Sequence, residues 1–152
     1  MFLNENIIVT NNVTLITLRN VPSDPCIISG VFETIANAQI NIDMISQTAP
    51  FGKKLEISFT VDDKDFADVL KLSNKFREQY PDISALVNNE NVKITVNDDL
   101  MAEKIGIAAQ IFKAVAKSGS EIKLVTTSET QVSLLVAVYD EDQIIKLLTT
   151  AG

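Results

Sequence analysis

The chain has no histidine among its 152 residues, which excludes a histidine-based catalytic triad, a histidine general base and a histidine metal site. Its single cysteine, Cys26, excludes an internal disulfide and is typical of a reducing compartment. Neither Gly-x-Gly-x-x-Gly nor a P-loop pattern occurs, so phosphate binding by a glycine-rich loop is not indicated. No apolar run reaches membrane-spanning length, and the N-terminal residues lack the basic segment of a signal peptide. We therefore expect a cytoplasmic protein without a cofactor.

The net charge of the chain limits the classes of molecule that it is expected to bind. Acidic residues outnumber basic ones by 20 to 13, and the net charge of −7 argues against nucleic-acid and membrane partners. Two acidic stretches, residues 62–65 and 97–99, lack the glycine and distal glutamate of an EF-hand, so we interpret them as helix caps and expect no metal site. Cys26 at a helix start is a conceivable nucleophile, but no base partner can be named. We predict a packing role for it and no catalytic residue.

The most informative pattern is an internal repeat. Residues 26–45 recur as residues 106–125, and residues 57–61 recur as residues 132–136 with an offset of 75. Within the first pair of segments four positions match at a constant offset (107 − 27 = 80), namely Ile27, Phe32, Ala36 and Ile42 with Ile107, Phe112, Ala116 and Ile122. Two copies of one supersecondary unit predict a pair of small modules.

Hydrophobic periodicity predicts the same element order in both copies. In the first copy, Asp24 and Pro25 are typical of a helix start, as N-cap and first helical residue. The predicted strands are residues 13–18, 40–45, 55–61 and 83–87, and the helices are residues 25–38 and a second one from 62 or 63 to about 80. In the second copy we expect strands at 92–96, 121–126 and 132–138, and helices at 105–118 and from 140.

This β-α-β-β-α-β order predicts an α+β fold of two ferredoxin-like βαββαβ modules, with antiparallel sheets covered by helices on one face. The second copy ends before a fourth strand, while residues 4–10 form a strand-like run that the first copy does not need. We therefore expect the first module, residues 12–88, to be inserted into the second, residues 1–11 plus 89–152. Each module leaves a sheet face or edge exposed, which favours a homodimer.

Two strand-to-helix turns, residues 20–26 and 97–106, are candidate ligand sites because the first N–H groups of a helix lack partners and favour a carboxylate. Asn41, Asp43 and Gln47 follow in the next predicted strand. We expect Asp43 to lie beside the first helix start, where it can hold an ammonium group while the helix holds a carboxylate. A solvated polar strand face is the alternative interpretation.

At these residues the sequence resembles the regulatory region of aspartate kinase, a pair of ACT domains. Residues 13–25 are similar to that family's first strand and ligand loop, residues 40–47 and 57–61 to its signature strands, and residues 127–136 to the strand pair of its second module. The resemblance implies effector binding at contacts between ACT domains. The effector-binding residues implied here are Ser23, Asp24, Pro25, Cys26, Ile27, Asn41, Ile42, Asp43, Gln47, Thr127, Ser128 and Glu129.

The resemblance further implies feedback control of lysine, threonine and methionine biosynthesis, in which lysine or threonine inhibits a separate ATP-dependent catalytic domain. The effector stays open between the two, and the charge of Asp43 favours lysine. Cys26 stands where the family usually has glycine, whereas the second copy keeps Gly106. We expect either a fragment of a longer kinase or a separate regulatory subunit.

Two alternatives remain at this point. One is a stand-alone ACT protein that senses another amino acid and regulates a different enzyme. The other is a ferredoxin-like enzyme such as an acylphosphatase, whose arginine and asparagine would have to be Arg19 and Asn20. These two residues end a strand and do not lie in a glycine-rich cradle, which disfavours that enzyme.

Overall fold

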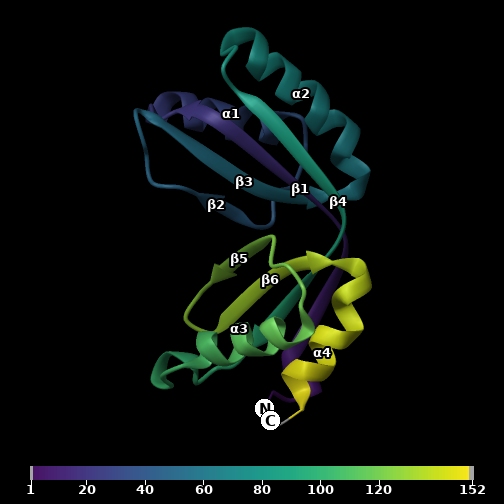
Figure 1. Cartoon of the computed structure of the whole chain (residues 1–152). Coiled ribbons are helices and arrows are strands. Elements are labelled where there is room, and N and C mark those ends of the chain that lie inside the picture. The colour runs from purple at the N-terminus through teal and green to yellow at the C-terminus, as the bar shows by residue number, and fades with distance from the viewer. Residues whose placement is uncertain (1, 151–152) are drawn as a thin grey trace. The chain divides into compact units, whose positions relative to one another are not determined.

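The computed structural model describes residues 2–150 and contains four α-helices and six β-strands among them (Figure 1). Two β-α-β-β-α repeats share two long strands, which confirms the predicted α+β class. The elements are β1 (Ile7–Pro22), α1 (Pro25–Asn37), β2 (Ile45–Gln47), β3 (Lys54–Asp62), α2 (Phe66–Gln79), β4 (Ser84–Asn97), α3 (Ile107–Ser118), β5 (Leu124–Thr127), β6 (Gln131–Ala137) and α4 (Glu141–Thr149). Short 3-10 helices cover Asn4–Asn6, Asp63–Asp65, Met101–Glu103 and Val138–Asp140.

The chain divides into two compact units. The inner unit is Val13–Asn89, and the outer unit is Met1–Asn12 together with Glu90–Gly152. The strand order is β2-β3-β1-β4-β6-β5, so the inner unit has the order β2-β3-β1-β4 and the outer unit the order β1-β4-β6-β5. Each therefore has the strand order of a ferredoxin-like module, and β1 and β4 contribute to both.

Both long strands contain a left-handed residue at the boundary between the units. Asn12 has φ 59° and Glu90 has φ 62°, a conformation that asparagine tolerates better than most residues. The sequence predicts separate strands at 4–10 and 13–18, and at 83–87 and 92–96. The structure joins each pair into one strand, because a single left-handed residue redirects the chain without ending the ladder.

Each unit has its own apolar core between its strands and its helices. In the inner unit Val31 and Ile35 of α1 pack with Phe59 of β3, and the ring of Phe32 meets that of Phe59 edge-on at 6.2 Å between centroids. In the outer unit Val115 of α3 belongs to the corresponding cluster. Figure 1 shows the two helices of each unit on one face of its strands, as predicted.

The N-terminal segment supplies side chains to the outer core. Ile7 and Val9 pack against that core, whereas Ile8 between them is 53% exposed. Phe2 is buried, and its N–H donates to the carbonyl of Leu148 at 3.0 Å. The predicted strand at 4–10 is therefore correct only from Ile7 onward, because Asn4–Asn6 forms a 3-10 helix.

The strand predicted at 40–45 is wrong in position, since β2 covers only Ile45–Gln47. Two consecutive residues face Thr60 of β3: the N–H of Asp43 donates to its carbonyl at 3.1 Å, and the N–H of Met44 donates to its Oγ1 at 2.9 Å. This bulge-like irregularity interrupts the alternation that the sequence suggests. Ile42 packs against the inner core, while Met44 is buried outside that cluster.

Other element boundaries differ from the predicted ones by one to four residues. Helix α3 begins at Ile107 and not at 105, because Gly106 has φ 91° and precedes it as the N-cap. Strand β5 begins at Leu124, three residues later than predicted, and β6 ends at Ala137, one residue earlier. Helix α2 begins at Phe66, three or four residues later than predicted, because Asp63–Asp65 forms a 3-10 helix. Strand β1 continues to Pro22, four residues beyond the predicted end.

Candidate functional site

The first strand-to-helix turn is held by Asp24. Its Oδ1 accepts the N–H of Cys26 at 2.8 Å, and Pro25 begins α1, so the predicted cap is confirmed. The carbonyl of Asp24 accepts the N–H groups of Ile27 and Ile28 at 3.0 and 3.1 Å. The expectation that this turn presents unpaired donors is therefore wrong, because Asp24 already satisfies all three. A carboxylate ligand here has to displace or supplement the Asp24 contacts.

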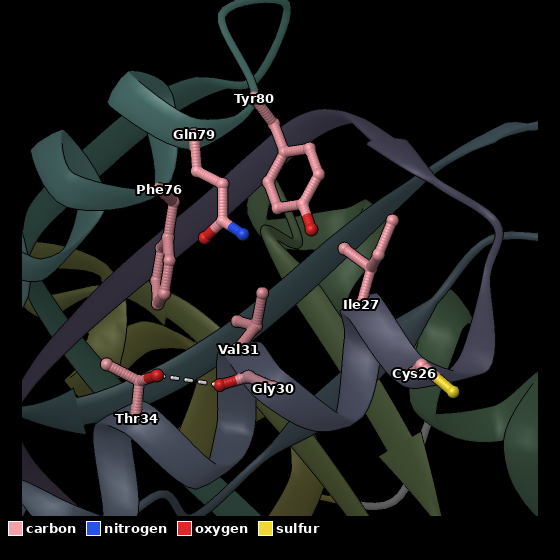
Figure 2. A pocket seen from close by; sticks show the side chains of 8 residues that line it. All are labelled: Cys26, Ile27, Gly30, Val31, Thr34, Phe76, Gln79 and Tyr80. Carbon is pink, nitrogen blue, oxygen red and sulfur yellow. Dashed lines mark hydrogen bonds between the residues drawn. The ribbon is translucent and has the colours of Figure 1, made fainter.

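Ser23, the residue before Asp24, is held in place by a backbone hydrogen bond. The N–H of Ser23 donates to the carbonyl of Lys53 at 3.0 Å, which ties the turn to the β2–β3 connection. Cys26 is exposed, and its side chain points away from the body of α1 and α2 in Figure 2. The prediction that Cys26 packs in the core is therefore wrong.

The second group of predicted residues lies on the extended segment before and within β2. Asn41, Asp43 and Gln47 are exposed, and Ile42 is half-buried. These positions flank β3 on the outer edge of the inner sheet, because β2 is the last strand in the order. The edge leaves one row of β2 backbone groups available for a partner.

Strand register separates Asp43 from the first turn of α1. Asp43 lies opposite Thr60, which pairs with Leu15 of β1, whereas α1 follows Pro22, which pairs with Lys54. Seven residues of strand span about 23 Å, and two residues of loop recover at most about 7 Å. The prediction that Asp43 lies beside the helix start is wrong within one chain. A single amino acid held by that turn does not reach Asp43 of the same copy.

The third group, Thr127, Ser128 and Glu129, belongs to the outer unit. These exposed residues form the β5–β6 turn, in which the N–H of Ser128 donates to the carbonyl of Gln131 at 2.9 Å. The Ser128 hydroxyl accepts the N–H of Thr130 at 3.4 Å. The turn is thus closed by its own backbone, and its Glu129 carboxylate lies on the surface.

The second strand-to-helix turn is organised differently from the first. Asp98 accepts hydrogen bonds from the side chain of Lys104 and from the N–H of Leu100, both at 2.9 Å. The Lys104 hydrogen bond, and after it the Leu100 N–H, lower the pKa of Asp98 below its ordinary value. Gly106 precedes α3 as its N-cap and provides no side-chain cap, since glycine has no side-chain acceptor. Asp98 closes the loop, and the helix start is left without a side-chain acceptor.

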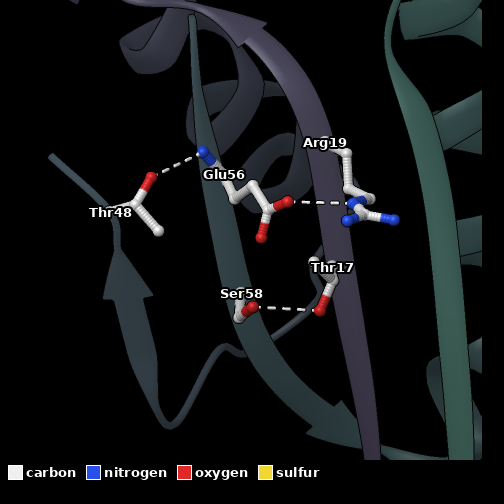
Figure 3. Close-up of polar contacts among 5 residues, drawn as sticks. All are labelled: Thr17, Arg19, Thr48, Glu56 and Ser58. Atoms are coloured by element: carbon white, nitrogen blue, oxygen red, sulfur yellow. Dashed lines mark hydrogen bonds and ion pairs between the residues drawn. The ribbon is translucent and has the colours of Figure 1, made fainter. Parts of the chain in front are cut away.

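Polar contacts cross the strands of the inner sheet at residues the sequence does not single out (Figure 3). Arg19 Nε donates to Glu56 Oε1 at 2.9 Å, and Thr48 Oγ1 accepts the N–H of Glu56 at 2.9 Å. The Thr17 and Ser58 hydroxyls share a hydrogen bond of 2.9 Å. The alternation of polar and apolar residues along β1 and β3 indicates which side chains lie on the polar face of the sheet. It does not indicate which of these polar residues are cross-strand neighbours.

Comparisons with known proteins agree with this architecture. The ACT domain family model matches residues 19–75 and 94–151, which is one match in each unit and more than half of the chain. The chain belongs to the ACT domain family. Each unit is thus one ACT domain, and the family resemblance inferred from the sequence is confirmed.

The relatives are aspartate kinases. Aspartokinase from Bacillus sp. (strain MGA3) is 29% identical over 138 residues, covering 90% of this chain and 32% of that protein. The structure of aspartokinase alpha and beta subunits has 26% identity and a TM-score of 0.85, covering 94% of both chains. The ligand-free regulatory subunit of aspartate kinase from Thermus thermophilus shares the fold, with 23% identity, a TM-score of 0.83 and 93% coverage of both chains. The chain spans about a third of the length of the curated relative it matches.

The inner ACT domain also contains a hollow of about 270 Å³ between α1 and α2. The sequence pattern assigns the residues that line this hollow to two predicted helices, but it does not predict that these two helices lie next to each other. Its lining consists of Cys26, Ile27, Gly30, Val31, Thr34, Phe76, Gln79 and Tyr80. Within residues 2–150 no cluster of acidic, cysteine or histidine side chains could hold a metal ion, and no helix is long and apolar enough to cross a membrane.

Proposed function

We propose that this ACT pair is the amino-acid-sensing regulatory region of an aspartate kinase, with lysine or threonine as effector. The observation that carries the proposal is the 90% coverage of this chain by its match to an aspartokinase, which extends through both ACT domains. In this proposal effector binding lowers catalysis in a separate catalytic domain that phosphorylates the side-chain carboxylate of aspartate.

The effector site is formed by two copies of the chain. The first turn of α1, residues 23–27, holds the amino acid, and Asn41, Ile42 and Asp43 of a second copy complete the site. Two observations support this arrangement. Strand register puts Asp43 at the far end of the strand from that turn in the same copy, and β2 is an exposed edge. Antiparallel pairing of β2 with its counterpart places residue 43 of one copy near residue 47 of the other, toward the end of the strand where α1 begins.

Recognition then follows from charge. Asp24 at the helix start positions the backbone, and the helix dipole favours the effector carboxylate. The Asp43 carboxylate of the second copy attracts a cationic end, which favours lysine over threonine. Thr127, Ser128 and Glu129 lie in the outer domain at the β5–β6 turn, and they are proposed to contribute through an equivalent ACT contact there.

Isothermal titration calorimetry against lysine, threonine, methionine, leucine and valine tests the proposal. Saturable binding of lysine or threonine is expected, with one site per copy because two copies form two equivalent sites. Ligand at about one hundred times its dissociation constant stabilises the folded state by about 2.7 kcal/mol, which a thermal melt detects. Binding of leucine or valine alone instead identifies an ACT protein that regulates a different enzyme.

A further inference from the structure

Gly30 lies in the middle of α1, where glycine costs about 1 kcal/mol relative to alanine. Nothing inside the chain demands it, because a Cβ at this position meets no atom within 4 Å and the backbone is not left-handed. Thr34 Oγ1 donates to the carbonyl of Gly30 at 2.7 Å. A helix glycine without an internal packing reason leaves the backbone open to close approach by a molecule outside the chain.

Gly30 lines the hollow between α1 and α2, and Figure 2 shows what surrounds it. Phe76, Gln79 and Tyr80 extend from the end of α2 toward Ile27 and Val31 of α1. None of the eight lining side chains is an acid, a lysine or an arginine. The walls are therefore mainly apolar and aromatic. The lining contributes no charged side chain to the electrostatic field inside the hollow.

Two polar side chains at the rim of the hollow make no hydrogen bond to other residues that the structure describes, namely the amide of Gln79, which is exposed, and the hydroxyl of Tyr80, which is half-buried. In Figure 2 both point into the space above α1. A cavity of about 150 Å³ holds a benzene ring, so a hollow of about 270 Å³ has room for one substituted ring. An apolar space with a few convergent hydrogen-bonding groups is the usual form of a small-molecule site.

The outer domain lacks this combination. Gln110 takes the place of Gly30 (110 − 30 = 80), and Ala114 takes the place of Thr34 (114 − 34 = 80). A long side chain replaces the open backbone position, and the neighbouring hydroxyl is lost. The open glycine therefore belongs to one of the two repeats.

We propose that the hollow between α1 and α2 is a second ligand site, specific to the inner domain, for a small uncharged molecule with one aromatic ring and one hydrogen-bonding substituent. The ring packs between Phe76, Tyr80 and the open backbone at Gly30. Its substituent exchanges hydrogen bonds with the Gln79 amide or the Tyr80 hydroxyl. The site shares Cys26 and Ile27 with the proposed effector turn, but the ring position between Phe76, Tyr80 and Gly30 lies outside that turn.

Protein-observed NMR titration of the full chain with phenol as probe tests this site. Saturable shifts are expected at the backbone amides of Gly30, Thr34, Gln79 and Tyr80. Gly30→Leu places a side chain in the hollow and is expected to weaken phenol binding at least about tenfold, since several CH₂ groups compete for the same space. Tyr80→Phe is expected to weaken it about two- to tenfold, as for loss of one neutral hydrogen bond.

The matched control is Gln110→Leu, which makes the equivalent change in the outer domain and is expected to leave phenol binding unchanged. Benzoate, a charged analogue, is expected to bind far more weakly, because no lining residue compensates its charge. Gly30→Ala adds one methyl group to open space in a helix, so it should fold and reduce affinity less than Gly30→Leu. This graded series remains informative if Gly30→Leu fails to fold.

The proposal is overturned if phenol shifts are not saturable, if they persist in Gly30→Leu, or if benzoate binds as tightly as phenol. Calorimetry with lysine and threonine on the same variants separates the two sites. Loss of phenol binding with amino-acid binding intact supports a separate site. Loss of both in Gly30→Leu, with Gly30→Ala unaffected in both, contradicts it.

Discussion

The hydroxyls of Thr17 and Ser58 lie 2.9 Å apart across β1 and β3, and the same pair recurs in the other ACT domain. There, Thr95 of β4 and Ser133 of β6 are also 2.9 Å apart. Ser58 and Ser133 share the offset of the strand repeat (133 − 58 = 75). The repeat thus preserves a cross-strand contact as well as a hydrophobic pattern.

A double-mutant cycle measures this contact in each domain. For Thr17→Val and Ser58→Ala we expect a coupling energy of about 0.5–1 kcal/mol, as for other cross-strand pairs. Thr95 and Ser133 are each only 6% exposed, so a single substitution there leaves a buried hydroxyl unpaired and costs about 1–3 kcal/mol. Urea unfolding provides the energies. Equal single-mutant costs in the two domains would contradict the role assigned to burial.

Removal of the α1 cap should destabilise the inner domain. Asp24→Ala deletes the acceptor for the Cys26 N–H and is expected to cost about 1 kcal/mol, or roughly 2–4 °C in melting temperature. Asp24→Asn retains an acceptor in the same place and should cost much less. Thermal denaturation followed by circular dichroism compares them, and an asparagine variant as unstable as the alanine variant would argue against capping.

Mixing of two variants tests whether the effector site is shared between copies. Asp24→Ala and Asp43→Ala homodimers should each bind lysine weakly, because every site lacks one group. In a mixed dimer one of the two sites regains both groups. Random exchange in an equimolar mixture makes about half of the dimers mixed, so calorimetry should show about a quarter of the normal stoichiometry at near-normal affinity. No recovery on mixing, or full lysine binding by Asp43→Ala alone, would refute the shared site.

The Asp98 loop should make the outer domain sensitive to acid. The pKa of Asp98 is lowered by Lys104 and by the N–H of Leu100, so its ionised form favours the folded state. Its contribution is fully present above the ordinary aspartate pKa of 3.8 and is lost as pH falls through the lowered value. The difference in unfolding free energy between the parent and Asp98→Asn should therefore shrink from pH 7 toward about pH 3. A difference that stays constant from pH 7 to about pH 3 would contradict the role assigned to the Asp98 carboxylate.

Side chains of the N-terminal segment should stabilise the outer domain selectively. Ile7→Ala removes a partly buried side chain from the outer core, and we expect a loss of about 1–2 kcal/mol. Ile8→Ala is the matched control, because Ile8 is 53% exposed. Hydrogen exchange should show lost protection in residues 90–150 and little change in residues 13–89. Equal losses in both domains, or a larger effect at Ile8, would contradict the inserted arrangement.

Local interactions made much of the fold predictable. Asp24 followed by Pro25 is a helix start that depends on neighbouring residues alone, and the structure contains it. The periodicity that predicted a strand at 55–61 and a helix after it is likewise consistent with the burial of Phe59, Val69 and Phe76, since one face of each element must leave water. These features depend on contacts within a few residues of the chain.

Partner strands decided what the sequence could not. Thr60 accepts hydrogen bonds from two consecutive N–H groups, those of Asp43 and Met44. Because of these bonds, β2 begins after the residues 40–44 whose apolar alternation predicted a strand. The Thr60 Oγ1 competes for a backbone donor, and a hydrogen bond of this kind cannot be predicted from hydrophobic periodicity.

The sequence by itself determined the two ACT repeats, the start of α1 and the family, because these depend on local propensity and on a pattern that recurs at fixed offsets. Only the tertiary structure decided that β1 and β4 are continuous through both domains and that Asp43 lies far from the first turn of α1 in its own chain. Only the tertiary structure brought Gly30 together with Phe76 and Tyr80. Strand register and helix packing bring residues that are far apart in the chain into contact. The stabilising energy of each such arrangement comes from contacts with the neighbouring strand or helix, which the local sequence does not reveal.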